Sequence, residues 1–222
     1  DTPTPHIDTV YALVKLLAFP EALQVLEFAG GRVSLVAVRA KSDGLLVGKP
    51  IQEMRSHLPP GVDARIAAIF REHQPLDPDG HTVIEPGDEV FVLAATEHIR
   101  TVLGAVRKMD QPVRRIMMAG GGKVGLRLAR QIQDDCQIKL IEPNLARCEY
   151  LATQLPPEVL VLHGDSTDED LLGEENVHEM DLFVSLTSDD EDNIMSCLLA
   201  KRLGVRRVLA IINRRAYADL VQ

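Results

Sequence analysis

Residues 115–129 read Arg115-Ile116-Met117-Met118-Ala119-Gly120-Gly121-Gly122-Lys123-Val124-Gly125-Leu126-Arg127-Leu128-Ala129. The apolar run before the glycines is typical of a buried strand, and apolar residues at helical spacing begin directly after them. Gly120, Gly122 and Gly125 form a G-x-G-x-x-G turn between the two patterns. In dinucleotide-binding folds these glycines permit a tight turn, a close approach of backbone to pyrophosphate, and packing of the helix on the strand. The stretch predicts an anion site at a helix N-terminus, where Lys123 and Val124 are the first residues.

A second strand pattern, residues 137–142, follows that helix and ends in Glu142. Glu142 lies about 20 residues beyond the glycine turn, the spacing of the acid that binds ribose hydroxyls in such folds. The competing interpretations are a solvated acid at a strand end and a flexible glycine loop without a ligand. Because strand, turn, helix, strand and acid occur in the expected order, we predict that the site binds a dinucleotide. A carboxylate at this position should repel a 2′-phosphate, which predicts NAD rather than NADP.

The composition of the 222-residue chain fits a folded protein of one or two domains. Hydrophobic residues make up 45% and charged residues 26%, both near the globular average. The formal net charge of -9 argues against a nucleic-acid-binding protein, because contact with phosphates needs a concentrated basic face. No apolar stretch of the sequence is long enough to span a bilayer. The three cysteines lack metal or disulfide spacing, which indicates a reducing, cytosolic setting.

The pattern of predicted elements changes near residue 110. Residues 1–108 predict a small α+β domain with a largely antiparallel sheet. Its expected strands are a first hairpin of 22–28 and 32–40, a strand at 64–71, and a second hairpin of 81–85 and 89–95.

Residues 113–222 alternate strand and helix patterns, which predicts a Rossmann-like, doubly wound parallel sheet in an α/β domain. The expected strands are 116–119, 138–142, 159–163, 182–186 and 208–212. Ligands bind such sheets at the carboxyl ends of the strands. Since a periodic apolar run continues at Gln222, we expect this domain to be truncated at its C-terminus and the chain to be a fragment.

Two polar segments follow the third and fourth strands of this domain. Asp165 and Ser166 reach an adenine edge in one interpretation; in the other they shape a turn and cap the next helix. Thr187 is positioned to face the nucleotide. The acidic run at 189–192 suggests a metal, but acids in the first turn of a helix complement its dipole, so we predict no metal site.

Two more residue pairs complete the survey of strand ends. Ser188 and Glu191 have the spacing of a capping box at the start of the following helix. Asn213 and Arg214 follow the fifth strand, where we expect contact with a ligand phosphate or with a neighbouring chain.

No pattern in the sequence predicts catalysis. Tyr11 and Lys15 have the tyrosine and lysine spacing of short-chain dehydrogenases, but here they precede the glycine turn, whereas in that family they follow it. No other positioned acid, base or nucleophile is evident after the turn. A nucleotide site without reactive groups predicts a sensor. The alternative is an NAD-dependent oxidoreductase or epimerase that lacks its substrate domain.

Several segments of this chain occur together in one known family. They are Gly120-Gly121-Gly122-Lys123-Val124-Gly125, Ile141-Glu142, His163-Gly164-Asp165-Ser166-Thr167-Asp168, the segment 186–194 and Ala200-Lys201-Arg202-Leu203-Gly204, with 44–51 and 84–90 in the first domain. In this combination the chain resembles the RCK/KTN family of bacterial potassium-uptake regulators. The resemblance implies an RCK C-terminal-type domain at 1–108 and an RCK N-terminal (KTN) domain at 113–222. Since some members carry two tandem halves, it also implies an internal fragment.

The resemblance carries functional expectations. It implies a cytoplasmic regulatory protein, not an enzyme, peripheral at the inner face of the membrane. Such proteins assemble into homo-oligomeric rings beneath a potassium-translocating membrane subunit of Trk/Ktr type and gate it according to bound NAD(H), ATP or ADP. The family's site residues map onto the phosphate turn at 120–125, Glu142 for ribose, Asp165 and Ser166 for the adenine side, and Thr187 for the fourth-strand contact.

Overall fold

The computed structural model describes residues 5–213 and divides the chain into two compact units. One, here called the antiparallel unit, is Lys15–Pro112. The other, the parallel unit, comprises Asp1–Val14 and Val113–Gln222, of which residues 5–14 and 113–213 are described. The first helix, α1 (Pro5–Ala18), therefore begins in the parallel unit, whereas the domain boundary predicted from sequence placed all of it in the first domain.

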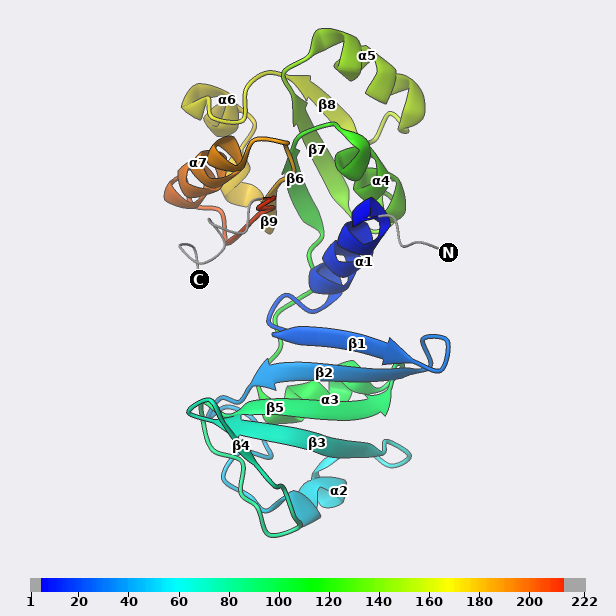
Figure 1. Cartoon of the computed structure of the whole chain (residues 1–222), viewed down its shortest axis with the longest axis vertical. Coiled ribbons are helices and arrows are strands. Elements are labelled where there is room, and N and C mark those ends of the chain that lie inside the picture. The colour runs from blue at the N-terminus through cyan, green and yellow to red at the C-terminus, as the bar shows by residue number, and fades with distance from the viewer. Residues whose placement is uncertain (1–4, 214–222) are drawn as a thin grey trace. The chain divides into compact units, whose positions relative to one another are not determined.

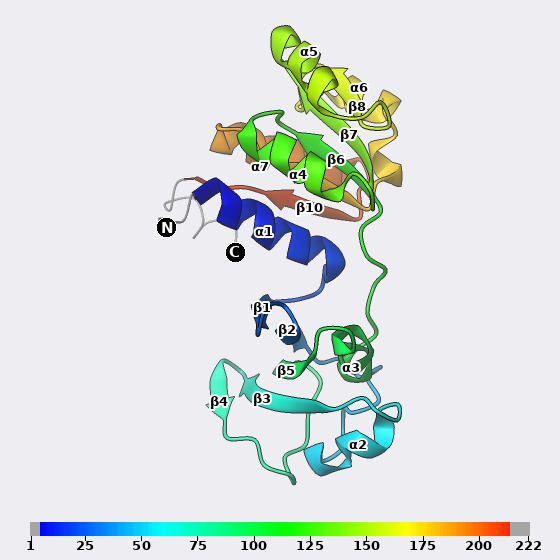
Figure 2. The same cartoon turned by 90° about the vertical axis from the view of Figure 1, so that its right-hand side faces the viewer.

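The antiparallel unit is built on one five-stranded sheet. In spatial order its strands are β1 (Gln24–Phe28), β2 (Val33–Arg39), β5 (Glu89–Ala95), β3 (Ala64–Arg71) and β4 (Gln74–Leu76). Figure 2 shows its helices, α2 (Met54–His57) and α3 (Ile99–Val106), on the same side of this sheet. A 3-10 turn (η1, Ile51–Glu53) precedes α2. Alternate residues of β2 pack with α3 because strand side chains point to opposite faces, so that Val36 and Val38 join Val102 in the core.

The first expected hairpin is confirmed and the second is wrong. β1 and β2 pair through a turn in which Gly30 and Gly31 both have positive φ. Residues 81–85 form isolated bridges instead of a strand, and β5 pairs with β2 and β3 at the centre of the sheet. The local alternation at 81–85 was misleading because Ile84 is buried at 1% exposure without belonging to the sheet. The short strand β4 was not expected.

The parallel unit contains the predicted Rossmann-like sheet. Its strands are β6 (Arg115–Ala119), β7 (Gln137–Glu142), β8 (Leu160–His163), β9 (Leu182–Ser185) and β10 (Arg207–Ala210), all parallel in the order β10-β9-β6-β7-β8. The connecting helices are α4 (Lys123–Ile132), α5 (Leu145–Gln154), α6 (Glu169–Glu174), the 3-10 turn η2 (Val177–Glu179) and α7 (Asp190–Arg202). A helix expected from Tyr217 onward lies outside the described residues, as does Arg214.

Helices cover both faces of this parallel sheet. Figures 1 and 2 show α4 and α5 on one face and α7 on the other. The adjacent residues Met117 and Met118 are consequently both fully buried, although neighbouring side chains of a strand point to opposite faces. The order of strands reverses at β6, which places a switch point at the carboxyl ends of β6 and its neighbours. Within residues 5–213, no helix is both long and apolar enough to cross a membrane.

Candidate nucleotide-binding site

The glycine turn between β6 and α4 is packed from two directions. Gly120 has φ of 107°, and a Cβ there would lie 3.0 Å from the carbonyl carbon of Leu186. A Cβ on Gly125 would lie 2.1 Å from the carbonyl oxygen of Gly120, so any larger residue would push α4 away from the turn. These contacts are the physical reason for the tight-turn and helix-packing positions of the motif.

Gly122 differs from its neighbours because nothing in the protein fills the space beside it. A Cβ at Gly122 would meet no atom within 4 Å, and the residue is exposed. Its backbone is the N-cap of α4, without a side-chain cap, and Leu126 donates the first helical hydrogen bond to Gly122 at 3.0 Å. The N–H groups of Lys123, Val124 and Gly125 precede that bond and point out of the helix end. This arrangement suits an anion that approaches the backbone closely.

The carboxylate of Glu142 lies at the carboxyl end of β7 and is buried at 9% exposure. Its Oε2 accepts a hydrogen bond from the Gly121 N–H at 2.8 Å, and its Oε1 accepts one from the Asn144 N–H at 3.0 Å. The side chain thus joins the glycine turn to the start of α5. A carboxylate has about four acceptor positions, so each oxygen can accept a further hydrogen bond from a ribose hydroxyl.

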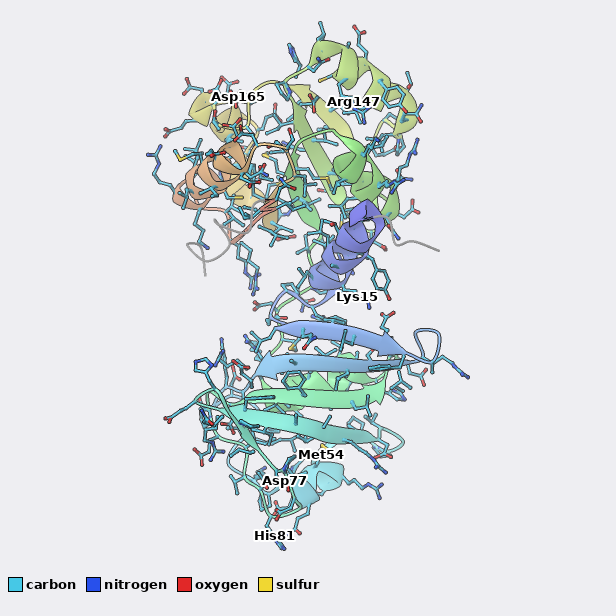
Figure 3. The ribbon with its side chains drawn as sticks, viewed as in Figure 1. Lys15, Met54, Asp77, His81, Arg147 and Asp165 are labelled. Atoms are coloured by element: carbon cyan, nitrogen blue, oxygen red, sulfur yellow. The ribbon has the colours of Figure 1, made fainter. Side chains whose placement is uncertain are left out.

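Arg147 contacts the glycine turn from α5, and sequence reasoning missed this contact. Its Nε donates to the Gly121 carbonyl oxygen at 2.6 Å, and its guanidinium lies 4.7 Å from the centre of the Tyr150 ring. Figure 3 labels Arg147 on α5. Its position five residues after Glu142, in the first turn of the next helix, was a signal that could have identified it.

Thr187 follows β9 and is held by one buried side chain, that of Asn193. The Thr187 N–H donates to Asn193 Oδ1 at 3.0 Å, and Asn193 Nδ2 donates to the carbonyl oxygens of Thr187 at 3.0 Å and Ile211 at 2.9 Å. Ser185 Oγ donates to the same Oδ1 at 2.8 Å. Asn193 is fully buried, so it fixes the ends of β9 and the chain after β10 to α7. Sequence reasoning missed this role too.

The start of α7 contradicts the predicted capping box but places the acidic run where the sequence predicted, in the first turn of a helix. The N-cap is Asp189, which accepts from the Asp192 N–H at 2.9 Å, so the predicted capping box of Ser188 and Glu191 is wrong. The acids nevertheless occupy the first helical turn, where they complement the dipole. Asp190, buried at 3% exposure, accepts two hydrogen bonds from Asn213, one from its N–H and one from its Nδ2.

Asp165 and Ser166 lie in the loop between β8 and α6, where Figure 3 labels Asp165. Asp165 Oδ1 accepts from the N–H and the hydroxyl of Thr167, both at 2.8 Å, which is a turn-shaping contact. Asp168 caps α6 and Ser166 is buried at 9% exposure. Neither Asp165 nor Ser166 belongs to the cleft lining described next, and their adenine role stays a prediction.

A cleft of about 490 Å³ opens at the carboxyl edge of the parallel sheet. This volume lies within the range of small-molecule sites. The cleft brings together most of the predicted residues, and its lining is Thr9, Gly120, Gly122, Lys123, Val124, Glu142, Pro143, Leu186, Thr187, Ser188, Ile211 and Asn213.

Two buried cysteines of the parallel unit, Cys148 and Cys197, have raised thiol pKa values. Burial, and then the charge of Glu142, raise the pKa of Cys148, whose Sγ donates to the Glu142 carbonyl oxygen at 3.2 Å. Burial raises the pKa of Cys197 to about 12, which leaves it a neutral thiol at physiological pH. Among the residues that the structure describes, no group of three or more histidine, cysteine or acidic side chains is placed to hold a metal ion.

Two family models match the chain. The TrkA-C domain matches residues 35–105 and the TrkA-N domain matches residues 116–222. The first match falls in the antiparallel unit, and the second covers the parallel sheet with its glycine turn and cleft.

The curated relatives of the chain include proteins named "Trk system potassium uptake protein TrkA". The protein of Halomonas elongata is 50% identical over 208 residues, and that of Vibrio alginolyticus is 47% identical over 208 residues. Each alignment covers 94% of this chain and 45% of the relative. The chain therefore spans about half the length of these relatives.

Solved structures show the same fold at low sequence identity. The crystal structure of the GsuK RCK domain has a TM-score of 0.61 at 16% identity, covering 97% of this chain and 46% of that one. A GsuK channel bound to NAD has a TM-score of 0.52 at 13% identity, covering 92% of this chain and 40% of that one.

Proposed function

The chain belongs to the TrkA family, with one TrkA-C and one TrkA-N domain, and from this premise we propose that its parallel unit is a nucleotide sensor for potassium uptake. In this proposal NAD(H), or ADP or ATP, occupies the cleft. The occupied protein then changes the opening of a potassium-translocating membrane subunit of Trk/Ktr type. The work is regulatory, as in the family, and no catalytic step is involved.

The observation that carries this proposal is the position of Glu142 beside an open helix N-terminus. The donors at the start of α4 supply the phosphate contacts, and Gly122 leaves room for the pyrophosphate. Glu142 borders the same cleft, already oriented by Gly121 and Asn144. A ligand that combines phosphates with a neighbouring ribose matches both groups. NAD is also the ligand named for a structural neighbour, the GsuK channel.

Glu142 also predicts the choice between NAD and NADP. Among the described residues Glu142 takes part in no ion pair, and in dinucleotide-binding folds an acid at this position lies where the 2′-phosphate of NADP would be. A ligand that carries this phosphate would meet an unfavourable charge contact, and NAD would not.

To regulate a membrane partner, the nucleotide needs to bind one arrangement of the protein only moderately better than another. A nucleotide shifts the equilibrium between two arrangements of the protein when it binds one of them better, and a tenfold preference supplies about 1.4 kcal/mol. In the proposed assembly, copies of the whole protein form a ring at the cytoplasmic face of the membrane, so that several cleft occupancies act on one membrane partner.

Calorimetric titration with NAD, NADH, ADP, ATP and NADP tests the proposal. We expect saturable binding of NAD(H) or of an adenine nucleotide, with NADP at least about tenfold weaker than NAD. Glu142→Gln removes the charge at similar size, and its amide nitrogen cannot accept one of the two backbone hydrogen bonds. NAD should therefore weaken, and the discrimination against NADP should disappear.

The matched control is Glu149→Gln, which removes an exposed acid from α5 in the same unit. It should leave all five affinities unchanged. If wild type binds none of the five ligands, the sensor proposal fails, and equal binding of NAD and NADP refutes the assignment of Glu142 to the ribose.

A further inference from the structure

The cleft has a wall that comes from outside the nucleotide-binding sequence. Thr9 lines it together with residues of the glycine turn, although 110 positions separate Thr9 from Gly120 and the antiparallel unit lies between them in the chain. Thr9 belongs to the first part of α1, which is one compact unit with the parallel sheet. Figures 1 and 2 both show the start of α1 next to α4.

Buried residues hold this part of α1 in place. Val10 is exposed at 4% and Leu13 at 6%, the three-residue spacing that turns two side chains to one side of a helix. Burying two such side chains stabilises a docked helix, since the free energy gained follows the apolar area removed from water. Thr9, which is half-buried, is therefore presented to the cleft by a packed helix.

The cleft also reaches across both halves of the parallel sheet. Glu142 is the last residue of β7, on one side of β6, while Thr187 and Ile211 follow β9 and β10, on the other side. In doubly wound sheets a dinucleotide lies across this switch point, with one nucleotide over each half. The glycine turn and Glu142 account for the adenosine and the pyrophosphate. The lining beyond β9 is then left for the second nucleotide, and Thr9 lines the same cleft.

We propose, resting on the proposed function, that α1 is part of the dinucleotide site: Thr9 contacts the second nucleotide of NAD(H), beyond the pyrophosphate. A hydroxyl both donates and accepts, so it suits a ribose hydroxyl or a carboxamide. ADP has the adenosine and the two phosphates but ends before this wall. The site therefore distinguishes a dinucleotide from a mononucleotide through a helix whose later residues, from Lys15 on, belong to the other unit.

Titration of the full chain with NAD and with ADP tests the assignment. Thr9→Val removes the hydroxyl at constant size and should weaken NAD about fivefold, the equivalent of about 1 kcal/mol. Thr9→Phe fills the cleft and should weaken NAD at least about tenfold. Neither substitution should change the affinity for ADP. The matched controls are Thr101→Val and Thr101→Phe, at an exposed helical threonine of the antiparallel unit.

A second measurement, hydrogen exchange of the wild-type protein, follows the backbone amides of α1 themselves and needs no substitution. NAD should slow hydrogen exchange of the backbone amides of residues 11–14, and ADP should not.

The outcomes separate this inference from the function on which it rests. Undiminished NAD binding in both Thr9 variants, or equal weakening of NAD and ADP, overturns the role of α1 while the sensor proposal stands. Equal protection of residues 11–14 by NAD and ADP overturns it as well. Wild type that binds neither ligand overturns both.

Discussion

Each unit of the protein contains a buried carboxylate whose surroundings can be compared, Asp88 in the antiparallel unit and Glu142 in the parallel unit. Asp88, in the antiparallel unit, is exposed at 1% and accepts hydrogen bonds from the Glu85 N–H and from two nitrogens of Arg71, all within 2.9 Å. Glu142, in the parallel unit, accepts two backbone hydrogen bonds and borders a cleft. Asp88 forms an ion pair with Arg71 of its own unit, whereas Glu142 forms no ion pair among the described residues.

The comparison teaches how to separate a structural acid from a binding acid. Burial opposes the charge of Asp88, but the hydrogen bonds and charge of Arg71 outweigh it and hold the pKa of Asp88 below its usual value. Such an ion pair stabilises the fold, and because Arg71 and the Glu85 N–H occupy its oxygens, Asp88 is not expected to bind a ligand. A buried acid with acceptor positions left over, at the carboxyl edge of a parallel sheet, is available for binding. The two acids should therefore respond differently to substitution.

The largest expected effect is on stability, in Arg71→Met. The substitution leaves the Asp88 carboxylate buried without its cation, which should lower the free energy of unfolding of the antiparallel unit by about 3 kcal/mol. Urea denaturation measures the loss. Arg55→Met, which breaks an exposed pair with Asp63 at 3.6 Å, is the control and should cost less than about 0.5 kcal/mol. Equal losses in the two variants would contradict a structural role for Asp88. Nucleotide affinity should stay unchanged in both.

A pair of glycine substitutions should separate packing from binding inside the parallel unit. Gly125→Ala places a Cβ 2.1 Å from the Gly120 carbonyl oxygen and should destabilise this unit by about 2 kcal/mol. Gly122→Ala meets no protein atom, so its stability cost should stay below about 1 kcal/mol. NAD affinity should nevertheless fall at least about tenfold in Gly122→Ala, because the ligand needs that space. Thermal denaturation of both variants measures stability, and titration measures NAD affinity. Unchanged affinity in Gly122→Ala would exclude a close approach of the pyrophosphate.

The smallest expected effect is a contrast in pH dependence. Since the pKa of Asp88 is lowered, its contribution to stability is present above its unfolded pKa, about 3.9, and is lost as pH falls through the folded value. Burial, and then the charges of Asp189, Asp165 and Glu191, raise the pKa of Asp192. We expect these effects to outweigh the favourable helix dipole, so that the ionised form disfavours the folded state and the penalty is relieved as pH falls through the raised value.

Comparison of each variant with wild type isolates these two contributions. Asp192→Asn should be slightly more stable than wild type at pH 7, and the difference should vanish in acid. Arg71→Met should be less stable at pH 7, and its difference should shrink only below about pH 4. Urea titrations at pH 7, 5 and 3.5 provide the values, and a constant difference for Asp192→Asn would show that its charge has no effect on folding.

The parallel sheet could be predicted from sequence because its strands are short buried runs, each separated from the next by a helical pattern. The core of β6, with Met117 and Met118 both buried, needs only an apolar run to be recognised. The antiparallel sheet depends on pairing between distant segments. The strand-like pattern of residues 81–85 suggested a hairpin with β5. In the structure β5 pairs with β2 and β3 instead, and a local sequence pattern does not show such distant pairing.

The candidate site was predictable where a residue type is dictated by the backbone. Gly120 needs a positive φ and Gly125 needs close contact, so a glycine spacing identifies both. Thr9 could not be found in this way, because only the three-dimensional fold brings it to the lining of the cleft. Arg147 could be identified only from its spacing after Glu142. The cap of α7 was misassigned to Ser188 because Asp189 beside it offers an equally good acceptor and the sequence alone does not rank them.

The buried amide of Asn193 has a consequence for how this protein can vary through evolution. Its oxygen receives the Thr187 and Ser185 donors while its nitrogen supplies two carbonyls, so the position demands an acceptor and two donors on a side chain of one length. Aspartate lacks the donors, leucine lacks both kinds of group, and glutamine is one carbon too long for a site with no exposed surface. Saturation mutagenesis with folding of the parallel unit as the readout should recover asparagine almost alone here. The neighbouring exposed positions Met195 and Leu198 of the same helix should accept many replacements as far as this unit's own folding is concerned.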